Sequence, residues 1–139
     1  MLSSILERNF MYRVEFYEDT NGYSELWEYL EELRCKSHNS KEARIQYQQV
    51  SLYIQLLQEY GTNLSARITK YIGSGIWELR PGNNRVFYFF FRDDTYVLLH
   101  HYRKKTQKTP RREIERAITE RQDYIAREEV TRRENMGRL

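Results

Sequence analysis

The alternation of apolar and polar positions predicts a β-meander between Lys70 and Pro110. Aromatic and β-branched residues fill three runs in this stretch, and Pro, Gly, Asn and Asp residues interrupt them. The runs cover residues 70–80, 85–91 and 96–105, and the turns cover residues 81–84 and 93–94. Because such runs separated by short turn-forming segments are typical of hairpins, we expect three consecutive antiparallel strands.

The pairing register of these strands decides which side chains share a face, because successive side chains point to opposite faces. We expect Arg80 opposite Arg85, and Phe91 opposite Tyr96. One face then carries Glu78, Arg80, Arg85, Phe87, His100, Tyr102 and Lys104. The other, apolar face carries Trp77, Leu79, Val86, Tyr88, Phe90, Val97 and Leu99 and is expected to pack on helices. An odd-length loop at either hairpin would break this grouping.

The rest of the pattern predicts one more strand, another extended segment and three helices. Residues 12–17 alternate as a half-buried strand does, and residues 65–72 form an extended segment that leads into the meander. Ser24 can cap a first helix, residues 41–60 form a second that ends at Gly61, and Pro110 fits the first turn of a third. Residues 1–10 are interpreted as an N-terminal extension, and residues 128–139 as a helical extension or a loose tail.

These elements describe an α+β fold in which two N-terminal helices and a C-terminal helix pack around a twisted antiparallel sheet. A chain of 139 residues suits one domain, here residues 1–139. Trp27, Trp77 and the aromatic run 87–91 are expected in its core. Cys35, the single cysteine, excludes an internal disulfide and a cysteine-rich zinc site, and we interpret it as an ordinary helix-end thiol.

Charge is informative locally rather than in total. The chain has 23 Lys and Arg against 20 Asp and Glu, a net charge of +3, which alone does not indicate nucleic-acid binding. Basic residues do cluster at Arg80, Arg85 and 103–108, which favours a site for a phosphate backbone. No apolar run is long enough for a membrane span, and the N-terminus lacks the features of a secretory signal, so the chain is expected in the cytoplasm.

The meander also carries a family resemblance. Residues 75–80 (GIWELR), 85–90 (RVFYFF), 98–100 (LLH) and above all 104–110 (KKTQKTP) resemble the HigB toxins of the RelE/ParE superfamily. The similarity is greatest to the phage-derived, Gp-type HigB branch. It extends over about residues 12–126 by the order of the elements.

The resemblance implies the toxin of a type II toxin–antitoxin pair. Such a toxin is an endoribonuclease that cuts mRNA on the ribosome, without a metal or other cofactor. Its expected partners are the ribosome, mRNA and a HigA-like helix-turn-helix antitoxin, through which alone it would meet operator DNA. Two alternatives share the fold: a ParE-like inhibitor of DNA gyrase without a catalytic site, and an inactive relative that only regulates an antitoxin complex.

The candidate catalytic residues follow from what metal-free RNA cleavage requires: a base, cations for the phosphoryl oxygens and an acid. Arg80 and Arg85 suit a phosphate clamp, although strand ends often carry exposed charges without a function. Further candidates are Lys104 as a cation or acid, His100 and Tyr102 as acid or base, and Glu78 as a base or, with slight preference, as an ion-pair partner of the arginines. Residues expected to bind RNA are Lys70, Arg103, Lys105 and Lys108.

Overall fold

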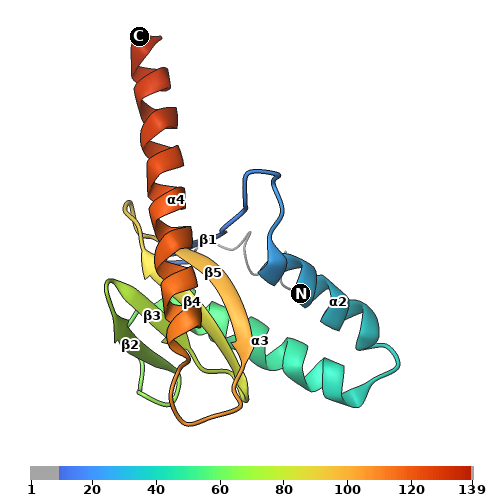
Figure 1. The fold of residues 1–139 in the computed structure, drawn as a ribbon. Coiled ribbons are helices and arrows are strands. Elements are labelled where there is room, and N and C mark those ends of the chain that lie inside the picture. The colour runs from blue at the N-terminus through green and yellow to red at the C-terminus, as the bar shows by residue number, and fades with distance from the viewer. Residues whose placement is uncertain (1–9, 139) are drawn as a thin grey trace.

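The computed structural model describes residues 10–138, which form one five-stranded sheet and three helices. In chain order the elements are β1 (Arg13–Phe16), α2 (Glu25–Lys36), α3 (Lys41–Tyr60), β2 (Thr69–Gly73), β3 (Ile76–Leu79), β4 (Asn84–Phe90), β5 (Thr95–Arg103) and α4 (Arg111–Gly137). The predicted α+β fold is confirmed (Figure 1). The interpretation of residues 1–10 as an extension lies, apart from Phe10, outside the described residues.

The sheet has the strand order β1-β5-β4-β3-β2. Strands β2 to β5 pair antiparallel in sequence order, so a meander is present. The run 70–80, predicted as one strand, divides at residues 74–75 into the paired strands β2 and β3, and the meander therefore has four strands instead of three. The prediction of a wholly antiparallel sheet is wrong at one edge, because β1 pairs parallel to β5. The α2–α3 hairpin lies between β1 and the meander in the chain, and it returns the polypeptide to the same end of the sheet.

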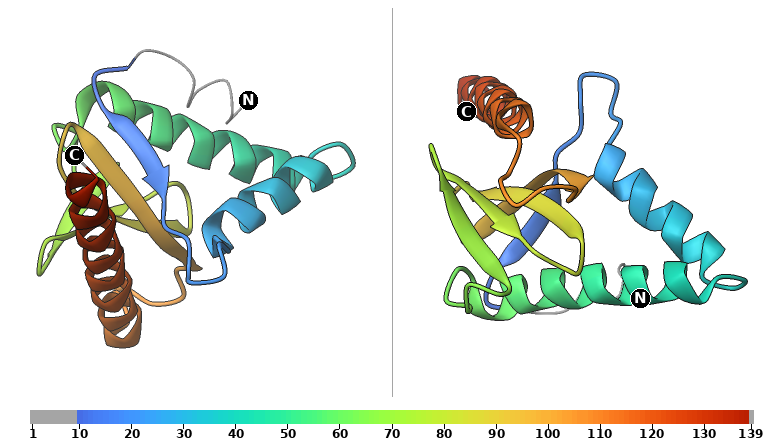
Figure 2. Two further views of the ribbon diagram at one scale, coloured as in Figure 1. Left: turned by 90° about the horizontal axis from the view of Figure 1, so that it is seen from above. Right: turned by 60° about the horizontal axis from the view of Figure 1, so that its bottom comes forward.

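Helices cover both faces of the sheet (Figure 2). On one face α2 and α3 pack on apolar residues that include Leu79, Val86 and Tyr88. On the other face α4 packs on Phe87 and Phe89 through Ala117, Tyr124 and neighbouring apolar residues. The sequence predicts helices on the first of these faces only, because it assigns the second face mostly charged residues.

The first of the two long hairpins has the predicted register. Leu79 pairs with Val86, which places Arg80 opposite Arg85. The turn between them contains Gly82 with a φ of 59°, a left-handed conformation that favours glycine. A Cβ there would also lie 2.8 Å from Gln49 Oε1.

The second hairpin departs from the predicted register. Phe90, rather than Phe91, pairs with Tyr96, because the loop has three residues and two of them, Asp93 and Asp94, adopt positive φ. This shift moves Val97 and Leu99 to the α4 face, contrary to the prediction. Phe90 is 47% exposed, so the predicted aromatic core does not include it.

A β-bulge in β5 then restores the predicted face for the end of the strand. The register changes between Val86, which pairs with His101, and Tyr88, which pairs with Leu98. Leu99 and His100 therefore both lie opposite Phe87 and both face α4. The one-residue shift at the hairpin and the one-residue bulge in β5 therefore cancel. As a result, Tyr102 lies on the same face of the sheet as Arg85 and Glu78, as predicted.

The helix ends agree with the sequence. Ser24 and Ser40 cap α2 and α3 by accepting backbone N–H bonds, and Gly61 ends α3. Pro110 precedes α4, which continues as a helix to Gly137 and so confirms the helical extension rather than a loose tail. Cys35 is an exposed free thiol near the end of α2. Within residues 10–138, no helix combines the length and the apolar character that a bilayer crossing requires.

Candidate functional site

A cleft of about 310 Å³ opens where β3 turns into β4 and where β5 leads into the loop 104–110. Its walls carry most of the predicted site residues, from segments far apart in the sequence. The lining residues with polar side chains are Lys70, Tyr71, Glu78, Arg80, Arg85, Tyr102, Lys104, Thr106, Gln107, Lys108 and Thr109. Five of these carry a positive charge and one a negative charge, so the cleft suits an anionic ligand.

A larger hollow of about 580 Å³ lies elsewhere, between β1, the start of α2 and the middle of α4. Four glutamates line it, namely Glu15, Glu18, Glu28 and Glu128, whereas Arg127 is its one cation among the lining residues. Arg127 also pairs with Asp123 at 2.7 Å. Such an acidic lining disfavours a phosphate backbone, so size does not identify the candidate site.

Glu78 lies at the base of the cleft and is only 2% exposed. Its Oε1 is 3.7 Å from the Nε of both Arg80 and Arg85. Its Oε2 accepts hydrogen bonds from Thr109 Oγ1 at 3.1 Å and, more weakly, from Tyr102 Oη at 3.4 Å. The carboxylate thus holds both guanidiniums with one oxygen and two hydroxyl groups with the other, which is the geometry of an ion-pair partner.

Arg85 differs from the exposed strand-end charge that the sequence suggests. The residue is 7% exposed, and its Nη1 donates to the backbone oxygens of Gly82 at 2.8 Å and Asn84 at 2.9 Å. Burial lowers the pKa of its guanidinium, and the charge of Glu78 opposes that shift. Arg85 therefore also fixes the β3–β4 turn, and its removal would affect stability as well as the charge of the cleft.

Arg80 and Lys104 are the more accessible cations beside Glu78. The side chain of Arg80 is 27% exposed, and its Nη1 donates to the backbone oxygen of Ala66 at 3.0 Å. Lys104 is half-buried, and its backbone N–H donates to Asn83 at 2.8 Å, which anchors the start of the basic loop. These two residues are best placed to meet an incoming phosphate.

Tyr102 and Thr109 form the wall of the cleft nearest α4. The ring of Tyr102 stacks on Phe87 with centroids 5.6 Å apart, and burial raises the pKa of its phenol. Tyr102 is therefore a proton donor and not a base near neutral pH. Thr109 has no place among the sequence candidates, because a threonine in a lysine-rich loop gives no signal until the fold brings it to Glu78.

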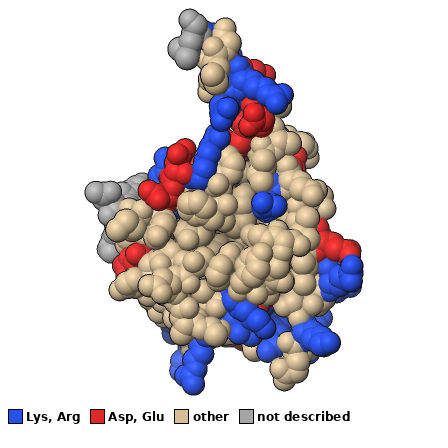
Figure 3. Space-filling model, turned by 90° about the vertical axis from the view of Figure 1, so that its left-hand side faces the viewer, with Lys and Arg blue, Asp and Glu red and all other residues tan. Residues whose placement is uncertain are grey.

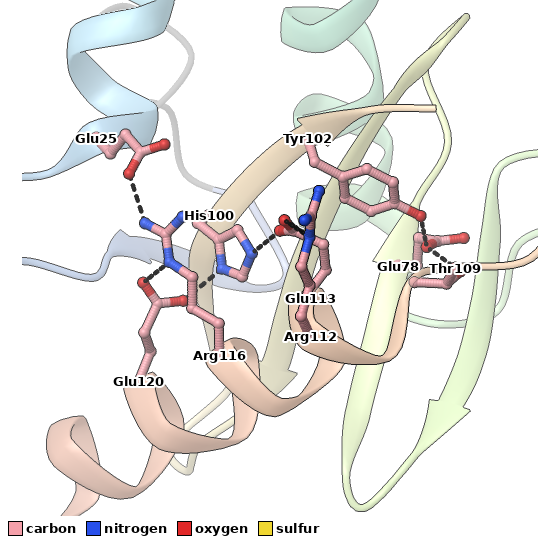
Figure 4. Close-up of polar contacts among 9 residues, drawn as sticks. All are labelled: Glu25, Glu78, His100, Tyr102, Thr109, Arg112, Glu113, Arg116 and Glu120. Carbon is pink, nitrogen blue, oxygen red and sulfur yellow. Dashed lines mark hydrogen bonds and ion pairs between the residues drawn. The ribbon is translucent and has the colours of Figure 1, made fainter. Parts of the chain in front are cut away.

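His100 lies on the same face of the sheet as Tyr102, as its parity predicts, but α4 covers it and it does not line the cleft. It is fully buried between Glu113, 2.8 Å from its Nε2, and Glu120, 2.5 Å from its Nδ1. Figure 4 shows this cluster beside, and separate from, the contacts of Glu78. The structure thus does not place His100 where it could act as acid or base on a ligand in the cleft.

His101 points to the opposite face, as predicted. Its ring stacks on Tyr29 with centroids 3.9 Å apart. Burial lowers the pKa of this imidazole to about 4.

The four predicted RNA-binding residues occupy different places. Lys70, which pairs across the sheet with Glu78, and Lys108 both line the cleft. Lys105 is exposed beside it, in a neighbouring hollow with Arg112. Arg103 points to the α3 side, where its Nη1 donates to Gln46 Oε1 at 3.0 Å. Figure 3 shows Lys and Arg side chains gathered along the lower part of one side of the molecule.

Comparison with protein families gives one match, to the family described as Phage derived protein Gp49-like (DUF891), over residues 40–122. The matched region includes α3, the whole meander, the cleft and the first half of α4. This family is associated with toxins of toxin–antitoxin systems. A search of curated proteins finds no match.

Proposed function

Because the chain belongs to the phage-derived Gp49-like family, we propose that it is a toxin of a type II toxin–antitoxin pair that cuts mRNA on the ribosome. The observation that carries the proposal is the cleft, in which Arg80 and Arg85 pair with a buried carboxylate and Lys104 adds a further cation to the lining. A toxin that acted only by binding would not require cations to be held by buried ion pairs at the base of a cleft.

The proposed reaction is attack of a ribose 2′-oxygen on the adjacent phosphorus. The bond from phosphorus to the 5′-oxygen breaks, the 2′-hydroxyl passes its proton to solvent water, and the leaving 5′-oxygen takes a proton from the ammonium of Lys104, which solvent then replaces. Negative charge increases on the phosphoryl oxygens in the transition state, and fixed guanidinium groups stabilise it because they need not reorganise during the reaction.

The residues of the cleft have different roles in this scheme. Arg80 contacts the phosphoryl oxygens, Arg85 supports it from within, and Glu78 orients both guanidiniums. Lys104 adds a second accessible cation on the opposite wall, near the leaving oxygen. Lys70 and Lys108 bind neighbouring phosphates of the message.

A cleft with so few contacts would bind free RNA weakly, and the ribosome supplies what is missing. It presents the message in a fixed geometry, so that the cost of orienting the substrate is met before the toxin binds. This accounts for a toxin that acts on translated messages.

The proposed partner in the resting state is a HigA-like antitoxin. We favour docking on α2 and α3, away from the cleft, because α3 exposes Ile45 and Leu52 one above the other at a spacing of seven residues. Bound there, an antitoxin prevents entry into the ribosome by its bulk while the cleft stays open.

Mapping of RNA 5′ ends after expression of the chain in bacteria tests the proposal. We expect new ends inside translated frames, and no such ends when translation is blocked first. Stalled replication with DNA breaks and intact messages would replace the proposal with the gyrase-inhibitor alternative.

A further inference from the structure

The first turn of α4 is weak by itself. Pro110 precedes the helix and offers no side-chain hydrogen bond to its free N–H groups. The first two helical residues, Arg111 and Arg112, place positive charge at the positive end of the helix dipole, where it is unfavourable. Glu113 is the one acidic residue of this turn, so the turn depends on what Glu113 binds.

Glu113 binds His100 of β5, in a buried cluster that also contains Glu120. Each ring nitrogen of His100 faces a carboxylate oxygen, at 2.8 Å and 2.5 Å. His100 is therefore within hydrogen-bonding distance of both carboxylates at once, and it links Glu113 to Glu120.

Positive charges from α4 surround the cluster. Arg112 Nε lies 3.8 Å from Glu113, and Arg116 Nε lies 3.5 Å from Glu120. Arg116 also reaches Glu25 of α2 at 2.5 Å (Figure 4). His101 of β5 and Tyr17 after β1 are also near enough to interact with Glu113 and Glu120, respectively. Each carboxylate therefore has one arginine of α4 beside it in addition to the imidazole of His100.

The contact between His100 and Glu113 spans the base of the loop 104–110. His100 lies on the strand before this loop, and Glu113 lies on the helix after it. The loop supplies one wall of the cleft through Lys104, Lys108 and Thr109. A loop with fixed ends has fewer conformations than one with a loose end. The contact between His100 and Glu113 therefore limits the positions that this loop, and with it one wall of the cleft, can take.

We propose that His100 is a positioning residue for the cleft: through Glu113 it seats the first turn of α4, and thereby holds Thr109 on the carboxylate of Glu78. His100 never touches the RNA. This proposal rests on the proposed function for its effect on cleavage, but its effect on the loop is independent of it.

Glu113→Ala tests the proposal, with Glu115→Ala as the matched control. Glu115 lies on the same turn region of α4, but its carboxylate is exposed and pairs with Arg111 at the surface. Two measurements are made on each full-length variant: amide hydrogen exchange of residues 104–114, and cleavage of mRNA in a translating extract. Glu113→Gln serves as the conservative variant, because its amide oxygen still accepts a bond from His100 Nε2.

In Glu113→Ala we expect exchange in residues 104–114 to be about tenfold faster or more, exchange in β3 and β4 to be unchanged, and cleavage to fall about tenfold or more, since small displacements in a site are costly. Glu113→Gln should restore both, and Glu115→Ala should change neither. If Glu113→Ala does not fold, Glu113→Asp, which keeps the charge and shortens the reach, gives the same comparison.

Unchanged exchange in the loop of Glu113→Ala would overturn the proposal. Faster exchange in Glu113→Ala together with full cleavage would also overturn the proposal, because the cleft would then not depend on the contact between His100 and Glu113. If the unmodified chain itself cuts no message, the proposed function fails, and the exchange measurement alone decides whether His100 positions the loop.

Discussion

Two clusters of buried charge lie side by side on the α4 face of the sheet, and they differ in their access to solvent. At Glu78 one carboxylate holds two guanidiniums and two hydroxyl groups, and the cleft opens directly above it. At His100 two carboxylates enclose one imidazole that is fully buried. Both clusters place carboxylates against basic side chains, and both connect the sheet to α4 or to the loop before it.

The two clusters therefore differ in whether a ligand from solvent can contact their charged groups. An anion that enters the cleft can share Arg80 with Glu78, because that side chain is partly exposed. No ligand reaches His100, so its contacts serve the protein alone. A buried histidine beside two glutamates thus reads as catalytic in the sequence, whereas in the fold it supports the site.

The largest expected effect is on stability, from His100→Ala. This change deprives both Glu113 and Glu120 of the imidazole that each contacts in the interior. Removal of one partner from a buried charged contact costs about 3–5 kcal/mol, and we expect the free energy of unfolding to fall by about that amount. Urea denaturation measures it. A loss below about 1 kcal/mol would show that the cluster does not fasten α4.

The next effect is on activity, from Arg80→Ala. Loss of a fixed cation that stabilises the transition state lowers the rate about a hundredfold or more. The loss of stability should be smaller than in His100→Ala, because Arg85, Thr109 and Tyr102 still contact Glu78. Cleavage in a translating extract measures the rate. Arg34→Ala, which removes an exposed arginine paired with Glu31 on α2, is the control. A fully active Arg80→Ala variant would remove Arg80 from the site.

The sequence predicts the position of a candidate residue correctly only where it also predicts the pairing register of its strand. The first hairpin is predictable because a proline, a glycine and two asparagines mark its turn, and the Arg80–Arg85 pairing follows. The second is not, because Asp93 and Asp94 adopt positive φ without a glycine to signal it. The bulge at Leu99 and His100 leaves no local mark in an apolar run, yet it returns Tyr102 to the predicted face.

Solvent access is the property that the sequence predicts least well. Arg85 and His100 are both predicted on the charged face of the meander, and both are buried. The cause is α4, whose narrow apolar stripe does not indicate that it covers a whole face of the sheet. The sequence does not indicate Thr109 as a site residue either, because its contact with Glu78 depends on where α4 begins.

His101, the next residue of β5, lacks the carboxylate partners that His100 has. It is buried without a hydrogen-bond partner at Nδ1 among the described residues, and burial lowers its pKa to about 4. Below pH 6.5 the unfolded chain therefore binds more protons than the folded one, and stability is lost as the pH falls toward 4.

His101→Phe keeps the stacking on Tyr29 and removes this titration. Relative to the variant, the unmodified chain should lose about 2 kcal/mol of unfolding free energy between pH 7 and pH 5, from a pKa of about 6.5 unfolded and about 4 folded. Denaturation of both proteins at the two pH values measures the difference. An equal loss in both would mean that the pKa of His101 is not lowered in the fold.

The smallest effect is expected from Tyr102→Phe, and it decides whether the hydroxyl groups at Glu78 act on the substrate or on the carboxylate. The bond from Tyr102 to Glu78 is 3.4 Å long, and Thr109 donates to the same oxygen at 3.1 Å. Loss of the weaker of two such bonds should cost no more than about 1 kcal/mol of stability. Because the ring still stacks on Phe87 and Thr109 still holds Glu78, cleavage should fall less than about tenfold. A proton donor to the leaving oxygen would contribute about a hundredfold or more. If cleavage fell about a hundredfold or more in Tyr102→Phe but was unchanged in Thr109→Val, Tyr102 would be the acid of the reaction. Only Thr109 would then remain as a hydroxyl group that orients the carboxylate of Glu78.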